Sequence, residues 1–209
     1  GSTRRGAITH VLTPTWADNL PAAWGRLSAL AGDGAEDSFR RTLEARGLLA
    51  EVERLMALSA FFTEQLARNL DWVGEHIDGD WLAPRDWTDE DWDRALADFT
   101  EGCDDENAYM AQLRRFRSRE MLRIVWRDFS HRGTLDETLA DVTALADCTI
   151  RFAVDRAVAQ LAPRYGEAVG AESGRVLPLV VLGMGKLGGQ ELNLSSDIDL
   201  IFCYPESGS

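Results

Sequence analysis

The sequence predicts an α+β chain in which a mainly helical region is followed by a short strand, a glycine-rich turn and a second strand. From about residue 16 to residue 160, apolar residues recur at spacings of three and four, and Ala, Leu, Glu and Arg dominate. From residue 177 the pattern changes to two short runs rich in branched apolar residues, with glycines between them. We therefore expect a helical region over 1–165, a linker over 166–176, and an incomplete strand-containing core over 177–209.

The composition is that of a globular chain. Its 209 residues are 45% hydrophobic, enough to bury a core, and its formal net charge is −13. That charge disfavours binding to nucleic acid, which depends on neutralising phosphates. No run approaches the roughly 20 apolar residues that a membrane helix needs. The three cysteines are widely spaced, so they suggest neither a metal site nor a disulfide framework. We expect a cytoplasmic protein whose partners are proteins or small molecules, not nucleic acid or a membrane.

Several helices can be located within the helical region. Residues 44–70 carry a broad apolar stripe between charged positions, which is typical of helices that pack in a bundle. Thr88 precedes three acidic residues and predicts a helix start, because its hydroxyl can accept a backbone N–H and acidic side chains favour the positive end of the helix dipole. Two long helices are expected after it, over 106–131 and 135–162, separated by Gly133.

The helix expected over 106–131 is rich in arginine and follows an acidic segment. The six arginines are Arg114, Arg115, Arg117, Arg119, Arg123 and Arg127. In one interpretation the acidic and basic segments pair or are solvated, each exposed pair adding at most about 1 kcal/mol. In the other, Arg115, Arg119 and Arg123 lie on one side of the helix and form a docking face for phosphate or for acidic residues of a partner. The sequence leaves both open.

Two aspartates stand at the start of the second predicted strand, 197–204. Asp197 and Asp199 are two residues apart, so both carboxylates are expected on one face, while Ile198 and Leu200 face the core. Like charges this close repel unless a divalent cation satisfies both, and hard oxygen ligands of this kind suit Mg²⁺. Taken alone, the pair is also compatible with a solvated strand entrance.

The glycine-rich turn over 183–189 lies a few residues upstream, where backbone N–H groups could hold phosphate oxygens opposite the metal. A Walker A loop requires Gly-Lys followed by Ser or Thr, but Lys186 is followed by Leu187. A Gly-x-Gly-x-x-Gly dinucleotide fingerprint is present from Gly183. However, the segment over 190–194 is too short for a crossover helix, and the aspartates precede the second apolar run instead of ending it.

A third pattern, that of nucleotidyltransferases, fits better. In it an apolar residue and two glycines open a helix, expected here as a short helix over 190–194, and an Asp-x-Asp strand follows. The stretch over 183–202, Gly-Met-Gly-Lys-Leu-Gly-Gly-Gln-Glu-Leu-Asn-Leu-Ser-Ser-Asp-Ile-Asp-Leu-Ile-Phe, resembles the signature of the glutamine synthetase adenylyltransferase/adenylyl-removing family. Asn193 with the Ser-Ser-Asp-Ile-Asp that follows resembles the N-terminal of that family's two nucleotidyltransferase domains, and 113–128 resembles the arginine-rich helix preceding that domain. The resemblance is strong over 110–206.

This resemblance implies a fold and an activity. The fold would be the first two strands of a nucleotidyltransferase α/β core. The activity would be removal of AMP from a modified tyrosine of glutamine synthetase by phosphorolysis, giving ADP. Asp197 and Asp199 would be the catalytic residues and would hold Mg²⁺. The phosphate or nucleotide would be bound by the backbone and side chains of Gly188, Gly189, Ser196 and Lys186. Alternatively, Lys186 and Ser196 are ordinary residues of an exposed turn.

The resemblance also implies partners and a limit. The partners would be glutamine synthetase, a PII-type signalling protein, ATP or ADP, and phosphate, within a bifunctional enzyme that regulates nitrogen assimilation. A third carboxylate normally comes from a later strand, which would lie beyond Ser209, so this chain alone is expected to bind metal weakly and to turn over nothing. The alternative is a catalytically inactive helical interaction or regulatory module with a partial nucleotidyltransferase core.

Overall fold

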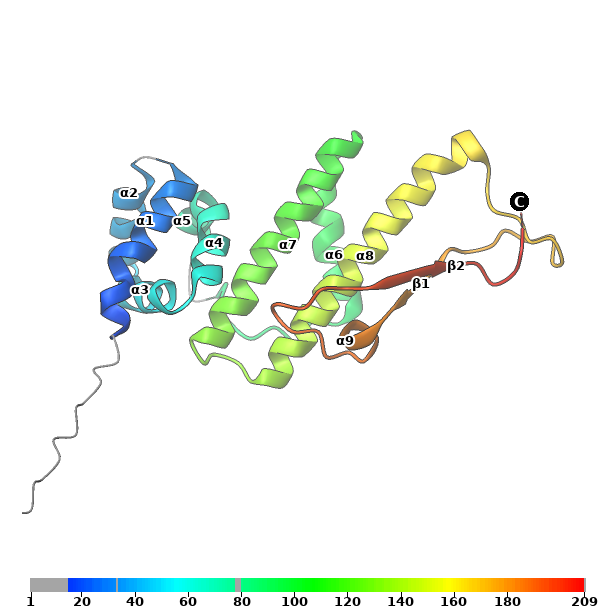
Figure 1. Ribbon diagram of the computed structural model, residues 1–209. Helices are drawn as coiled ribbons and strands as arrows, with labels where there is room; N and C mark the ends of the chain where they lie inside the picture. The colour runs from blue at the N-terminus through cyan, green and yellow to red at the C-terminus, as the bar shows by residue number, and fades with distance from the viewer. Residues whose placement is uncertain (1–14, 33, 78–79, 209) are drawn as a thin grey trace, which may run out of the picture. The chain divides into compact units, whose positions relative to one another are not determined.

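The computed structural model describes residues 15–32, 34–77 and 80–208 (Figure 1). The chain divides into two compact units, Gly1–Gly74 and Glu75–Ser209. Most of the described residues are helical, and two strands near the C-terminus form an antiparallel sheet. The predicted α+β fold class is confirmed. Among the described helices, none is both long enough and apolar enough to cross a membrane.

The first unit is helical. Its elements are η1 (Trp16–Asn19), α1 (Leu20–Ala31), α2 (Ala35–Ala45), α3 (Leu49–Leu58), α4 (Ala60–Arg68) and α5 (Leu70–His76), and the unit boundary falls within α5. Helix α1 packs against α3 and α4 around buried Leu27, Val52 and Phe62. The apolar stripe expected over 44–70 is divided among several helices. One break is at Ser59, which has an extended backbone and whose side chain accepts the Phe62 N–H to cap α4.

The second unit contains the two long helices. Its helical elements are α6 (Asp89–Thr100), α7 (Glu106–Phe129), α8 (Leu135–Tyr165) and the short α9 (Gly185–Gly188). The predicted start at Thr88 is confirmed: its side chain accepts the Asp91 N–H, and the Asp91 carboxylate accepts the Thr88 N–H in return. Helices α7 and α8 begin at the expected residues. Helix α8 continues three residues further than expected and ends where Gly166 adopts a positive φ of 79°.

The sheet consists of β1 (Val180–Gly183) and β2 (Leu200–Cys203), with Val180 opposite Cys203 and Gly183 opposite Leu200. It lies beside the middle of α8 (Figure 1). A cavity of about 280 Å³ separates the sheet from α8. It is lined by apolar side chains, among them Ile150, Val154 and Leu200, and by charged residues of α8 that include Asp147 and Asp155. The half-buried Leu200 therefore faces the helical side of the sheet.

Two details of the strand–turn–strand segment differ from expectation. The second strand begins at Leu200, three residues later than predicted, so both aspartates precede it. The short helix forms at Gly185–Gly188 instead of 190–194. It ends there because Gln190 takes a left-handed backbone conformation, with φ 58°, while the Glu191 N–H donates to the Lys186 carbonyl oxygen (2.8 Å). Residues 190–194 are irregular.

Candidate functional site

The glycine-rich turn joins the end of β1 to α9. A Cβ atom at Gly188 would overlap the carbonyl oxygen of Gly183, so only glycine allows α9 to pack against the end of the strand. The N–H groups of Gly188 and Gly189 donate within the turn, to the carbonyl oxygens of Met184 (3.4 Å) and Gly185 (3.0 Å). Gly188 therefore lets the backbone of α9 approach the backbone at the end of β1.

Asp197 and Asp199 lie in the irregular segment that leads into β2, and both are exposed. The Asp199 carbonyl oxygen accepts the Met184 N–H (2.9 Å), which continues the pairing of the two strands by one bond. Neither carboxylate has a hydrogen-bonding or ionic partner within the described ranges. Ile198 does not face the core as predicted, because the segment is not yet a strand; its exposed fraction is 42%.

A tight turn precedes the aspartates. The side-chain oxygen Oδ1 of Asn193 accepts the Ser196 hydroxyl (2.5 Å) and the Ser195 N–H (3.3 Å), and the Asn193 carbonyl oxygen accepts the Ser196 N–H (3.2 Å). Ser196 thus helps to shape the turn. Lys186 lies on α9 with its side chain exposed.

The loop that carries the aspartates is attached to α8. The Leu192 N–H donates to the Thr143 hydroxyl oxygen (3.2 Å), and the Gln190 side-chain amide approaches the Asp147 carboxylate (3.4 Å). Between this loop, α7 and α8 lies a cavity of about 320 Å³ that Asp197 and the exposed Arg117 both line. The sequence alone does not single out Thr143, because a threonine on the apolar side of a helix has no distinguishing pattern.

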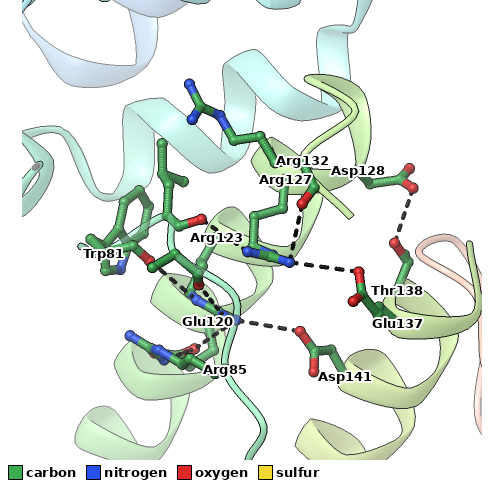
Figure 2. A network of polar contacts seen from close by, with 12 residues as sticks. Trp81, Arg85, Glu120, Arg123, Arg127, Asp128, Arg132, Glu137, Thr138 and Asp141 are labelled. Atoms are coloured by element: carbon green, nitrogen blue, oxygen red, sulfur yellow. Dashed lines mark hydrogen bonds and ion pairs between the residues drawn. The ribbon is translucent and has the colours of Figure 1, made fainter. Parts of the chain in front are cut away.

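The arginine-rich helix has a structural role at its C-terminal end (Figure 2). Arg123 is fully buried, and its guanidinium donates to the carbonyl oxygens of Trp81 and Ala83 (both 3.2 Å) and pairs with Asp141 (3.4 Å). Arg127 donates to the Leu82 carbonyl oxygen (2.9 Å). Of the docking face considered for Arg115, Arg119 and Arg123, the structure excludes Arg123, because its hydrogen bonds are all internal.

The electrostatics of this network follow from burial. Burial raises the pKa of the Asp141 carboxyl, while the nearby Arg123 guanidinium opposes that shift. Arg85 and Glu120 form an adjoining ion pair (2.8 Å). Within the acidic segment, Asp93 pairs with Arg151 of α8 (2.6 Å) and Asp91 pairs with Arg94 of its own helix (3.1 Å).

The donor set at the aspartates fits a hard divalent cation. Over the described part of the chain, no three His, Cys, Asp or Glu side chains cluster in a way that could hold a metal ion by themselves. Mg²⁺ usually needs only one or two protein carboxylates, because waters and substrate phosphates complete its coordination. Asp197 and Asp199 supply two exposed carboxylates without competing partners among the described residues.

Comparison with known proteins identifies the family. Residues 49–209 match the model of glutamate-ammonia ligase adenylyltransferase. The chain is 41% identical over 187 residues to the bifunctional glutamine synthetase adenylyltransferase/adenylyl-removing enzyme of Pseudomonas aeruginosa, covering 90% of this chain and 18% of that protein. The enzyme of the same name from Shewanella loihica is 42% identical over 159 residues, which is 76% of this chain and 16% of the relative. The chain thus spans less than a fifth of the length of these relatives and belongs to the glutamate-ammonia ligase adenylyltransferase family.

Proposed function

We propose that this chain carries part of the adenylyl-removing site of a bifunctional enzyme that regulates glutamine synthetase. The observation that supports this most directly is the pair of exposed carboxylates, Asp197 and Asp199, joined to the glycine-rich turn by the bond from the Met184 N–H to the Asp199 carbonyl oxygen. The names of the relatives supply the two candidate activities. We assign removal because Asn193 and the Ser-Ser-Asp-Ile-Asp after it resemble the N-terminal nucleotidyltransferase domain of the family.

In the proposed reaction, an oxygen of inorganic phosphate attacks the phosphorus of the AMP group in line with the tyrosine oxygen. The new bond gives ADP, the bond to tyrosine breaks, and the tyrosine oxygen takes up the proton that the attacking hydrogen phosphate releases. Asp197 and Asp199 would hold Mg²⁺, which would supply positive charge to offset the charge that develops on the transferred phosphoryl group. The glycine-rich turn, which includes Gly188 and Gly189, is linked to the aspartate segment by the bond from the Met184 N–H to the Asp199 carbonyl oxygen and would border the phosphate.

Two side chains complete the proposed phosphate or nucleotide contacts. Lys186 is exposed on α9 and can present its ammonium group to an anion. The Ser196 hydroxyl donates its only hydrogen to Asn193, so it would fix the turn before Asp197 and accept a bond from a hydroxyl or amino group of the nucleotide. A third carboxylate, needed for full activity, would come from a later strand.

The proposal implies a domain organisation for the chain and a set of binding partners. The helical region over 1–165 and the linker over 166–176 would precede the catalytic core that begins at residue 177. The partners would be glutamine synthetase, a PII-type signalling protein, ATP or ADP and phosphate, and the enzyme would act in the cytoplasm.

A helical interaction module is the second candidate function. The observation that favours it is the exposure of Arg114, Arg115 and Arg117 near the middle of α7, where their positive charges would attract an acidic partner. In that case the aspartate pair would be catalytically silent.

The deciding experiment measures ADP release from adenylylated glutamine synthetase in the presence of phosphate and Mg²⁺. The enzyme should be of full family length and carry this sequence, and it should be compared with the double variant Asp197→Asn, Asp199→Asn. We expect phosphate-dependent ADP release that the double variant loses. No release from a folded parent enzyme would favour the interaction module.

A further inference from the structure

The loop between α9 and β2 is attached to the helical scaffold at a buried point. The Leu192 N–H donates to the hydroxyl oxygen of Thr143 (3.2 Å), and the exposed fractions of these residues are 4% and 1%. Leu192 also lines the cavity of about 320 Å³ together with Met121 of α7 and Leu145 of α8. A main-chain group of the loop and an apolar side chain are thus both buried against the scaffold.

This attachment is connected to the aspartates through a short, bonded path. Leu192 is followed at once by the Asn193 turn, in which Asn193 accepts hydrogen bonds from Ser195 and Ser196. Asp197 comes next, and the Asp199 carbonyl oxygen is held by the Met184 N–H. The segment is therefore fixed at both ends, by α8 at Leu192 and by the sheet at Asp199.

The Thr143 hydroxyl differs in its bonding from other buried threonines of α8. The Thr149 hydroxyl donates within the helix, to the carbonyl oxygens of Leu145 and Ala146, and the Thr138 hydroxyl donates to the Thr134 carbonyl oxygen and to the Asp128 carboxylate of α7. That of Thr143 accepts a hydrogen bond from a residue 49 positions later in the chain. Without an acceptor there, the Leu192 N–H would be buried and unsatisfied, so the loop would have to shift to expose it to water.

We propose that Thr143 is a positioning residue for Asp197 and Asp199: by accepting the Leu192 N–H, it sets the place of the aspartate segment relative to the sheet. This inference rests on the proposed function, in which the two carboxylates hold Mg²⁺. The helical scaffold then determines the geometry of the site without contributing a group that touches substrate.

The test compares three variants in an enzyme of full family length that carries this sequence. Thr143→Val keeps the shape of the side chain but removes the acceptor, and Thr143→Ser keeps the acceptor. Thr149→Val is the matched control, because it removes a buried hydroxyl from the same helix that bonds only within the helix. The measurements are kcat and the Mg²⁺ dependence of ADP release, together with hydrogen exchange, by mass spectrometry, of peptides covering 190–199.

We expect Thr143→Val to lower kcat on the order of tenfold, since small displacements of a catalytic group are costly, and to raise the Mg²⁺ concentration needed for half-maximal activity. Hydrogen exchange over 190–199 should be faster in Thr143→Val than in the parent. Thr143→Ser should restore kcat, the Mg²⁺ dependence and the exchange rate. Wild-type kcat and Mg²⁺ dependence in Thr143→Val, or an equal loss in Thr149→Val, would overturn the proposal.

The two proposals fail in different ways. If the parent enzyme releases no ADP, the proposed function is wrong, and exchange together with Mn²⁺ binding followed by electron paramagnetic resonance then decides the role of Thr143. Faster exchange over 190–199 and weaker Mn²⁺ binding in Thr143→Val alone would support it. Exchange and Mn²⁺ binding equal to those of Thr149→Val would overturn it.

Discussion

The buried guanidinium of Arg123 donates its Nε hydrogen to the backbone carbonyl oxygen of Trp81, 42 residues earlier in the chain (3.2 Å). Helix α7 thereby holds the segment that leads into α6 by its main chain. A second bond from Arg123 to the Ala83 carbonyl oxygen and one from Arg127 to the Leu82 carbonyl oxygen reinforce this attachment (Figure 2).

Replacing Arg123 with methionine should destabilise the second unit strongly. The change leaves the carbonyl oxygens of Trp81 and Ala83 without their donor and the Asp141 carboxylate without its buried partner, at a cost of about 3–5 kcal/mol in the free energy of unfolding. Urea unfolding measures this. Arg115→Met is the control, because the Arg115 side chain is exposed on the same helix and should change stability by less than about 0.5 kcal/mol. Equal unfolding midpoints for the two variants would contradict the role of Arg123.

Replacing Gly188 with alanine should disturb the turn before the aspartates. The added Cβ would overlap the Gly183 carbonyl oxygen, and relieving that overlap should cost about 1–3 kcal/mol in stability. Gly25→Ala provides the contrast, since a Cβ at this helical position meets no atom within 4 Å and should stabilise α1 by up to about 1 kcal/mol. Thermal unfolding of both variants checks the prediction, which fails if Gly188→Ala is as stable as the parent.

The capping box at Thr88 should make stability depend on pH. Hydrogen bonds from the Thr88 backbone and side chain lower the pKa of Asp91 below its ordinary value of 3.8. A lowered pKa in the folded state means that the stabilisation is fully present above the ordinary value and is lost as the pH falls through the lowered one. Asp91→Asn should therefore be less stable than the parent at neutral pH, and the difference should shrink below pH 3.8. Unfolding midpoints at a series of pH values measure this, and a constant difference would disprove it.

The three cysteines should react at different rates. Burial, together with a hydrogen bond to Asp93, raises the pKa of Cys148 to about 12, whereas Cys103 and Cys203 are half-buried. Because the thiolate is the reactive form, iodoacetamide at pH 8 should label Cys103 and Cys203 in the folded chain and reach Cys148 only after unfolding. Mass spectrometry of the labelled peptides distinguishes the sites. Labelling of Cys148 in the folded chain at the rate of the other two would refute this assignment.

Features set by neighbouring residues could be predicted from the sequence. The capping box at Thr88 and the starts of α7 and α8 depend on residues within one turn, so their local pattern was sufficient. The family signature around the aspartates was equally local. The start of β2 was predicted three residues too early, because alternation of polar and apolar residues does not show where pairing with another strand begins.

Features that depend on distant segments could not be predicted. Arg119 and Arg123 occupy equivalent positions on successive turns of α7, yet Arg123 is fully buried, because carbonyl oxygens some forty residues earlier lie against it. The anchor at Thr143 likewise depends on a backbone N–H 49 residues away. The backbone groups that bond to Arg123 and Thr143 are chemically the same as those of any other peptide bond. The sequence therefore does not indicate that these contacts form.

The attachment of 81–83 to α7 through main-chain oxygens has a consequence for mutational tolerance. A guanidinium that binds a backbone carbonyl oxygen makes no contact that depends on the side chain of the acceptor residue. Every amino acid, including proline, has that oxygen. These hydrogen bonds therefore do not restrict which amino acids occupy 81–83, where only packing limits substitution. On α7, by contrast, the same bonds require arginine. Saturation mutagenesis should show this asymmetry as many accepted substitutions at Ala83 and few at Arg123. Lysine cannot replace Arg123, because it lacks the planar guanidinium with several N–H donors.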